Sequence, residues 1–292
     1  MPDRTAVCLL LAIAARAAAQ NPCPELSRFA AFAHAEIGAI ELYRAAAPAK
    51  ALLFVSQMQV NTDGAPDSYH PDNLGITHLC NGLSVGAPGR ACVWKPDCLA
   101  DFRKARAAGF TGDPKICFFA MVTTRDGRPV LQKEGDPKPG YYISTTALKS
   151  PGKPADRPEA QLDSNAIPFV VIPGKWNRRF EDAGLGDVAA VYRKSNGRLE
   201  FAVVGDTGPN NKLGEGSVAL HLALGNDPFV TRSGVRRAGH GIGGRDVVYL
   251  LFPGSRNAMR AFTAEAIRAE GRRQSEAFGG EAKLKECAAA AR

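Results

Sequence analysis

The sequence predicts a mainly β protein, built as a β-barrel or a β-sandwich with helical segments at both ends. Three observations predict this class. Short apolar runs rich in β-branched residues recur through the middle of the 292-residue chain, separated by Gly, Pro and Asn. That region holds almost no helical periodicity. By contrast, residues 25–48 and the stretch after residue 256 are rich in Ala and Glu.

The first residues have the layout of an export signal. A short polar start precedes an apolar run over residues 5–15, and Ala17 and Ala19 form a small-x-small site before Gln20. This layout predicts a signal peptide over residues 1–19, too short for a membrane span. A short buried helix is the alternative. We therefore expect a secreted or periplasmic protein with no membrane span.

Cysteine usage agrees with export. Six cysteines follow the predicted signal peptide, and an even number in an exported chain favours disulfides over metal or catalytic use. No C-x-x-C pair of the kind used by zinc sites is present. The pairing is left open, apart from an expected link between Cys23 and Cys287.

The chain is basic without a concentrated basic segment. Loss of the signal peptide lowers the formal net charge from +8 to +7. Lys and Arg are scattered singly or in pairs, and aromatic residues do not alternate with them as they do in single-strand binders. We expect no nucleic-acid partner.

The two ends are predicted to be helical extensions. Within residues 20–49, apolar positions such as Leu26, Phe29 and Phe32 follow a helical stripe that Pro48 ends. Residues 255–292 form the predicted C-terminal helical tail. The intervening residues, 50–254, are assigned to the barrel domain.

Within this domain, Gly, Pro and Asn residues mark the boundaries between the predicted strands and loops. Residues 80–116 carry Cys, Gly and Pro and predict an irregular, disulfide-linked excursion, while the Pro-rich residues 149–164 predict a surface loop. Strands are expected over residues 51–60, 118–124, 129–133, 143–148, 166–173, 186–193 and 247–252.

The central feature is a predicted hairpin within residues 197–225. Two apolar runs, 199–204 and 217–224, flank a turn-rich loop with Asp206 at one mouth and Glu215 at the other. Two carboxylates across a groove suit glycoside hydrolysis, in which one protonates the leaving oxygen and the other activates water or attacks. The alternative is plain turn chemistry, since Asp beside Gly commonly caps a turn.

An acidic stretch follows the first predicted strand of the domain. Asp63, Asp67, His70 and Asp72 lie close together in the sequence, but their spacing matches no known metal loop. We interpret the stretch as a polar turn or the lining of a sugar cleft, and expect neither a metal site nor a cofactor.

These residues carry a resemblance to a known family. The motifs are Asn-Thr-Asp-Gly-Ala-Pro at 61–66, Tyr-His-Pro-Asp at 69–72, the apolar strand 167–173 and, most specifically, Val-Gly-Asp-Thr-Gly at 204–208 with Gly-Glu-Gly-Ser at 214–217. Together they make the region of about residues 50–254 similar to the family 75 glycoside hydrolases, the fungal-type chitosanases and their bacterial relatives.

The resemblance implies a fold and an activity. The fold is a compact β-barrel, with the double-psi type as one form. The activity is endo-acting, inverting hydrolysis of β-1,4-linked glucosamine polymers by an exported enzyme, with Asp206 and Glu215 as the essential carboxylates. We expect Glu215 to act as the acid and Asp206 as the base.

Five further residues form the expected substrate-binding set. Asp63 and Asp72 are candidates for binding glucosamine ammonium groups, and His70 lies in the same stretch. Tyr69 and Trp176 are candidates for stacking on sugar rings, with core packing as the alternative.

Charge bears on the choice of substrate. A chain of +7 repels polycationic chitosan at long range, although screening confines this field to about 8–10 Å at physiological salt. The polysaccharide substrate is thus chitosan or a related cell-wall glycan.

Two rival functions follow from the sequence. One is a non-catalytic barrel that binds cell-wall glycan or a partner protein. The other is a hydrolase that uses Ser217, His221 or His240, but the G-x-S-x-G motif and its strand–turn–helix context are missing.

Overall fold

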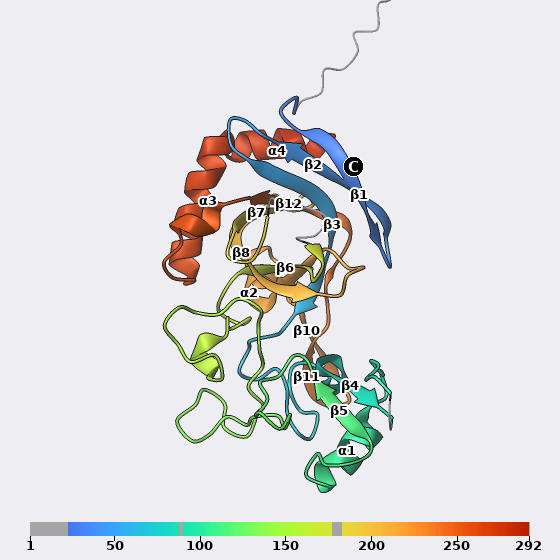
Figure 1. Cartoon of the computed structure of the whole chain (residues 1–292). Helices are drawn as coiled ribbons and strands as arrows, with labels where there is room; N and C mark the ends of the chain where they lie inside the picture. Colours follow the sequence, from blue (N-terminus) through green and yellow to red (C-terminus); the bar gives the residue numbers. More distant parts are fainter. Residues whose placement is uncertain (1–22, 88–89, 177–182, 292) are drawn as a thin grey trace, which may run out of the picture.

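The computed structural model describes residues 23–87, 90–176 and 183–291. Its centre is a closed six-stranded barrel (Figure 1), which confirms the predicted mainly β class. Around the barrel the strands are β3 (Ala51–Asn61), β12 (Ile242–Phe252), β7 (Val188–Arg193), β8 (Leu199–Gly208), β6 (Phe169–Pro173) and β9 (Glu215–Ser217), and β9 pairs back onto β3. The predicted signal peptide lies outside the described residues.

Period-two alternation gives the barrel wall two buried faces. In β3, Phe54 belongs to the interior cluster, whereas Leu53 and Val55 belong to the outer one. In β12, Tyr249 stacks on Phe54 inside the barrel, with ring centroids 4.6 Å apart. These strands are buried on both sides, which explains why they appear as continuous apolar runs in the sequence.

The prediction of an N-terminal helix is wrong. Residues 25–48 form an antiparallel pair, β1 (Ser27–His34) and β2 (Gly38–Ala45), and β2 continues the sheet along the start of β3. Ile40 and Leu42, two residues apart, are fully buried. Sheet pairing with β3 and burial of alternate residues therefore override the helical preference of the Ala-rich sequence.

The predicted C-terminal helices are present. α3 (Ala264–Phe278) and α4 (Gly280–Ala290) pack against the outside of the barrel (Figure 1). Phe278 and Leu284 are buried in the outer cluster that also contains β3 and β12 residues. The short helices η2 (Pro158–Ala160) and η4 (Ser255–Ala258) lie in connecting segments.

A small lobe lies beside the barrel (Figure 1) and contains β4 (Leu83–Gly86), β5 (Lys115–Phe118), η1 (Leu79–Gly82) and α1 (Leu99–Ala107). The predicted disulfides are present, as Cys80–Cys98 and Cys92–Cys117 in this lobe and Cys23–Cys287 between the chain ends. The hairpin of β10 (Phe229–Arg232) and β11 (Val235–Ala238) contacts the lobe, where the Ala238 N–H donates to the Ile76 carbonyl at 2.8 Å.

Three predicted strands, 118–124, 129–133 and 143–148, do not form a regular sheet. They meet only through isolated bridges, such as Met121 with Ser144 and Leu131 with Tyr142. The Gly and Pro residues between them favour turns over extended ladders.

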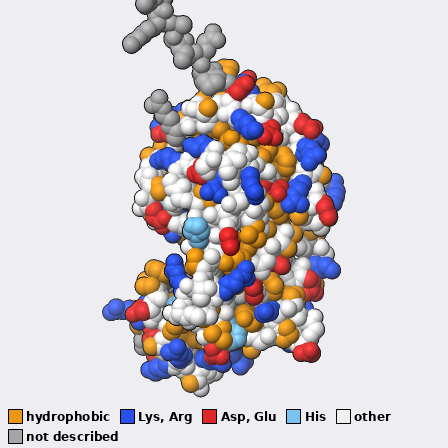
Figure 2. All heavy atoms as spheres, turned by 180° about the vertical axis from the view of Figure 1, so that it is seen from behind, with side chains coloured by type: hydrophobic (Ala, Val, Ile, Leu, Met, Phe, Trp, Pro, Cys, Tyr) orange, Lys and Arg blue, Asp and Glu red, His pale blue; other side chains and the backbone are white. Residues whose placement is uncertain are grey.

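The surface is of mixed charge. Figure 2 shows Lys and Arg side chains interspersed with Asp and Glu over one face of the molecule. Within the described ranges, none of the helices combines the length and the apolar character that crossing a bilayer requires.

The Cys23–Cys287 bond joins residues 264 positions apart. We predict that replacing both residues by Ser lowers the free energy of unfolding by about 2–5 kcal/mol, because the bond restricts the unfolded chain. Urea denaturation of both proteins under oxidising conditions measures this difference. An unchanged midpoint and slope would contradict it.

Candidate active site

Asp206 and Glu215 lie on one face of the barrel wall. Asp206 is in β8 and Glu215 begins β9. Strand β6 lies between these two strands, and its residue Val171 is the register partner of both acidic residues. Residues at one register position project to the same face of a sheet. Two strand spacings place the Cα atoms roughly 10 Å apart.

The hairpin prediction is wrong, although its two acidic residues come together. β8 and β9 are not partners, because β6 pairs with both of them. The predicted strand over residues 217–224 is absent, because β9 ends at Ser217 and α2 (Val218–Ala223) begins directly after it. Ser217 caps this helix by accepting from the Leu220 N–H at 3.2 Å. A short apolar run alone does not distinguish a buried strand from a buried helix.

Two glycines shape the space around Glu215. Gly214 has a φ of 104°, and a Cβ there would lie 2.4 Å from the Gln57 carbonyl oxygen. Gly208 follows Asp206 by two residues; a Cβ there would lie 3.2 Å from Val171 Cγ1 and 3.6 Å from Glu215 Oε2. Glycine at 208 therefore keeps side-chain atoms out of the space next to the Glu215 carboxylate.

Of the two carboxylates, that of Asp206 is held more firmly by hydrogen bonds. Its Oδ1 accepts the backbone N–H groups of Ala147 and Thr207, each at 2.8 Å. These bonds favour the charged form, but burial outweighs them and raises the pKa of Asp206 to about 7. The group therefore keeps a proton at mildly acidic pH.

Glu215 is less enclosed than Asp206. Burial raises its pKa, while a hydrogen bond from the Asn61 side chain and the charge of Lys212 act in the opposite direction. Lys212 Nζ also forms an ion pair with Glu36 Oε1, at 3.0 Å.

Asp63 is the third member of a carboxyl cluster with Asp206 and Glu215. Tyr69 Oη donates to Asp63 Oδ1 at 2.8 Å. Burial raises the pKa of Asp63 well above its ordinary value, and the neighbouring charges of Asp206 and Glu215 raise it further. Of the predicted site residues, the structure thus brings together Asp63, Tyr69, Asp206 and Glu215.

The other predicted binding residues lie elsewhere. Asp72 forms an ion pair with Arg106 of α1 at 2.7 Å, and its side chain is exposed. His70 packs edge-on against Tyr141, and its Nδ1 accepts from the Asp72 N–H at 3.0 Å. Both residues therefore belong to the surface of the small lobe.

Neither aromatic residue chosen for sugar stacking has a free ring face. Trp176 is 1% exposed and packs in the barrel interior with Phe54, at a centroid distance of 6.4 Å. Tyr69 is 2% exposed in the core of the small lobe, so it positions Asp63 instead. The alternative of core packing is correct for both rings.

Sequence reasoning missed Asn61 and Lys149. Lys149 Nζ donates to Thr145 Oγ1 and Gln161 Oε1, and burial lowers its pKa while Asp206 opposes this change. Asn61 comes directly after the predicted strand 51–60, and a polar residue at the end of a strand is a candidate for a functional site. Lys149 falls in a segment predicted to be a surface loop, and no sequence signal connects it with Asp206.

The structure does not support a Ser–His pair. Ser217 Oγ accepts from the Phe169 N–H at 3.0 Å as well as capping α2. His221 is buried on α2 beside the Gln59 carbonyl and Asn226, and burial lowers its pKa to about 4. His240 Nδ1 lies 3.0 Å from the Asp227 carbonyl oxygen.

Within residues 23–87, 90–176 and 183–291, no group of three or more His, Cys, Asp or Glu side chains is placed to hold an ion.

The raised pKa of Asp206 makes stability depend on pH. The native state favours the protonated carboxyl of Asp206. Below about pH 4 the group is protonated in the folded and the unfolded protein alike, so its ionisation does not affect stability. As the pH rises from about 4 to about 7, the free energy of unfolding falls, because only the unfolded protein releases the proton easily. We predict that Asp206→Asn raises the free energy of unfolding at pH 8 by roughly 2–4 kcal/mol and changes it little at pH 4.

Urea denaturation at the two pH values measures the effect. Asp72→Asn is the control, because its bond to Arg106 lowers the pKa of Asp72 and no gain is expected at pH 8. An Asp206→Asn effect of equal size at both pH values would contradict the prediction.

Comparison with known proteins finds a family model that matches part of the chain. A search of curated proteins finds no match, but the model described as "Fungal chitosanase of glycosyl hydrolase group 75" matches residues 138–278. The match contains Asp206 and Glu215 and ends at the last residue of α3. It supports a chitosanase-like polysaccharide hydrolase. Over this region the chain is similar to the family 75 glycoside hydrolases, which supports the resemblance found in the sequence.

Proposed function

We propose that the chain is an exported, endo-acting chitosanase that cleaves β-1,4 bonds between glucosamine units with inversion. The observation that carries the proposal is the placement of Asp206 and Glu215 on one face, with a single strand between them. Inverting enzymes hold their two carboxyl groups about 6.5–9.5 Å apart, to leave room for water. A Cα separation of roughly 10 Å, with both side chains projecting from one face, is compatible with a gap of this size between the carboxyl groups, and the family resemblance favours inversion over retention.

The two environments favour Asp206 as the acid and Glu215 as the base, the reverse of the sequence expectation. Asp206 is almost fully buried, and its pKa of about 7 keeps it protonated at the start of the reaction. Glu215 is more accessible, and Asn61 and Lys212 favour its charged form.

In this mechanism Asp206 gives its proton to the glycosidic oxygen as the bond to the anomeric carbon breaks. Glu215 takes a proton from a water molecule, whose oxygen attacks the same carbon from the opposite face. The products are a new reducing end of inverted configuration and a free hydroxyl on the leaving sugar. Proton exchange with solvent restores both carboxyl groups.

A row of polar side chains on β3 supports binding of a polymer. Gln57, Gln59 and Asn61 alternate with the buried Met58, so they project from the outer face of the barrel, and Gln59 pairs with Glu215. Glu36 accepts hydrogen bonds from both glutamines, which together with Lys212 lower its pKa to about 2. Because Glu36 is already paired with Lys212, the row supports polymer binding through its amide groups, which can hydrogen-bond sugar hydroxyls.

The proposed export rests on the disulfides. All six cysteines in the described part of the chain are paired, as Cys23–Cys287, Cys80–Cys98 and Cys92–Cys117. Such bonds persist in oxidising compartments, so a secreted or periplasmic location is the one they support.

We predict that Asp206→Asn and Glu215→Gln each lower reducing-end release from soluble chitosan by about 10²–10⁴-fold, the usual contribution of a positioned acid or base. Asp72→Asn is the matched control, because this carboxylate lies in an exposed ion pair, and it should retain wild-type activity. Proton NMR of the first products reports their anomeric configuration.

Three results would count against the proposal. Wild-type protein that releases no reducing ends from chitosan, chitin or peptidoglycan would favour a non-catalytic glycan-binding barrel. Full activity of either acid variant would remove that residue from the mechanism. Products of retained configuration would exclude inversion.

Asp63 is proposed as a positioning residue that acts through Asp206. Its carboxyl group lies within electrostatic reach of Asp206, and the charge of Asp206 adds to burial in raising the pKa of Asp63, so Asp63 is the neutral partner when Asp206 ionises. We predict that Asp63→Asn, which is also neutral, leaves the alkaline limb of the kcat profile at its wild-type pH. A limb that moves to lower pH would show that Asp63 carries a charge beside Asp206 and would contradict this assignment.

A further inference from the structure

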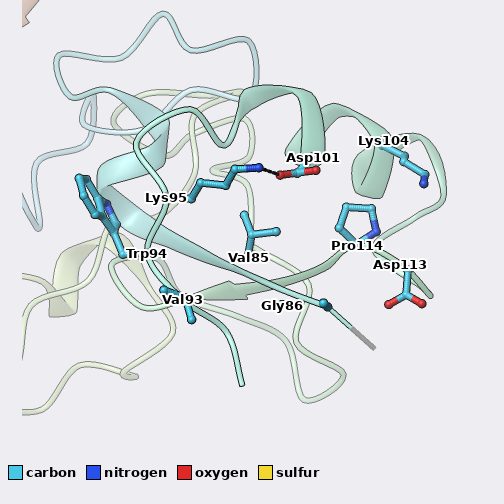
Figure 3. Close-up of a pocket in the computed structure, with 10 residues that line it drawn as sticks. Val85, Gly86, Val93, Trp94, Lys95, Asp101, Lys104, Asp113 and Pro114 are labelled. Atoms are coloured by element: carbon cyan, nitrogen blue, oxygen red, sulfur yellow. Dashed lines mark hydrogen bonds and ion pairs between the residues drawn. The ribbon is translucent and has the colours of Figure 1, made fainter. Parts of the chain in front are cut away.

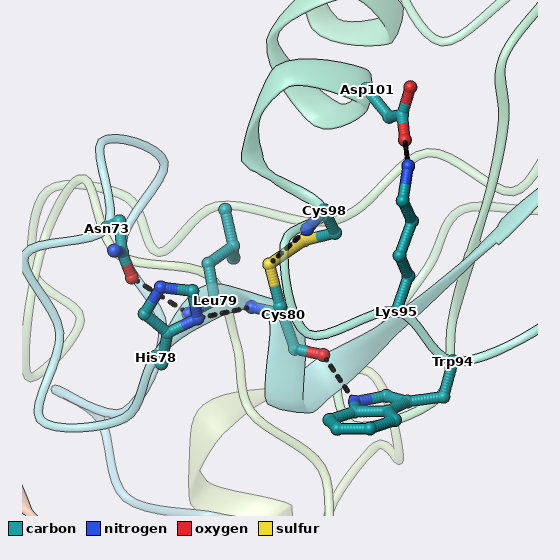
Figure 4. The surroundings of a disulfide bond; sticks show 8 residues. All are labelled: Asn73, His78, Leu79, Cys80, Trp94, Lys95, Cys98 and Asp101. Atoms are coloured by element: carbon teal, nitrogen blue, oxygen red, sulfur yellow. Dashed lines mark hydrogen bonds and ion pairs between the residues drawn. A yellow bond between two sulfur atoms is a disulfide. The ribbon is translucent and has the colours of Figure 1, made fainter.

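The small lobe presents a tryptophan to solvent in a fixed position. Trp94 is 54% exposed, and its neighbour Val93 is 69% exposed. The indole Nε1–H donates to the Cys80 carbonyl oxygen at 3.0 Å, as Figure 4 shows. The polar edge of the ring is therefore satisfied by the protein, while the residue as a whole stays exposed and available for contact with a ligand.

Covalent bonds hold the segment that carries this ring at both ends. Cys92 is bonded to Cys117 at the end of β5, and Cys98 is bonded to Cys80 in η1. Between these two cysteines, Lys95 Nζ contacts Asp101 Oδ2 of α1 at 2.7 Å. A side chain held in this way loses little conformational freedom when it binds a ligand.

A hollow lies next to the same segment. It has a volume of about 470 Å³ and is lined by side chains from three parts of the lobe (Figure 3). Its wall combines apolar groups, among them Val85, with two carboxylates and two ammonium groups, those of Asp101, Asp113, Lys95 and Lys104. This size and this mixture of apolar and charged groups are typical of small-molecule sites.

We propose that Trp94 and this hollow form a second binding site for the glucosamine polymer, separate from the carboxyl cluster. An indole face offers apolar contact to the C–H face of a sugar ring, and it attracts an ammonium group through the ring quadrupole. Glucosamine units present both features. The ligand class rests on the proposed function, whereas the platform itself is a property of the fold.

The chain contains two tryptophans, so fluorescence tests the site directly. Trp176 is buried and reports folding, whereas Trp94 is exposed. In the Glu215→Gln protein, which should not consume the probe, a glucosamine hexasaccharide should shift the emission saturably. Trp94→Phe in the same background should abolish most of this shift. An absent shift, or one that survives Trp94→Phe, would overturn the proposal.

Binding to insoluble chitosan gives a second test. We expect Trp94→Ala to weaken binding of the full-length protein by about 5–10-fold. Leu131→Ala, which removes another exposed apolar side chain, is the matched control and should bind as the wild type does. Equal binding of the Trp94→Ala and wild-type proteins would overturn the proposal.

The two hypotheses fail in different ways. If wild-type protein releases no reducing ends but Trp94 still responds to the hexasaccharide, the proposed hydrolysis is wrong and the binding site stands. If chitosan is hydrolysed while Trp94→Ala binds it as tightly as the wild type, the second site is wrong and the proposed function stands.

Discussion

The pairing of β6 with both β8 and β9 is the constraint on which the candidate site depends. This one short strand fixes Asp206 and Glu215 at the same register, through Val171, although they lie on strands that are not partners. Closure of the barrel by β9 on β3 then adds Gln59 beside Glu215. The geometry of the carboxylates therefore follows from backbone hydrogen bonds and not from mobile loops, which favours a well-defined separation.

Burial of three carboxyl groups in one place is costly, and the structure shows how the cost is limited. Backbone N–H groups and the Tyr69 hydroxyl stabilise the charged forms of Asp206 and Asp63, but burial still raises the pKa of both. A cluster in this state holds protons near neutral pH, which lowers the free energy of unfolding there but is a condition that an acid catalyst needs. The pH dependence of stability and the proposed acid catalysis therefore have the same cause, which is the raised pKa of the buried carboxyl groups.

The sequence was sufficient for the class of the fold, and it singled out two acidic residues that the barrel places on one face. Apolar runs around Gly and Pro marked the barrel strands, and the motif around Asp206 and Glu215 carried the family resemblance that the match to residues 138–278 confirmed. Local patterns could not predict that the Ala-rich residues 25–48 join a sheet, because only pairing with β3 decides this. Nor could they show that Trp176 faces the barrel interior. Ala147 and Asp206 are 59 residues apart in the sequence, so only the fold shows that the Ala147 N–H donates to the Asp206 carboxylate.

The bond between Cys23 and Cys287 has a topological consequence. It closes residues 23–287 into a covalent ring, in which the Cα atoms of the two bonded residues are 4.8 Å apart. One peptide-bond cleavage anywhere inside that ring opens it without separating the pieces, so a protease must cut twice to release a fragment. The same closure means that a linker attached before residue 23 and one attached after residue 287 would emerge side by side, on the helix-covered side of the barrel.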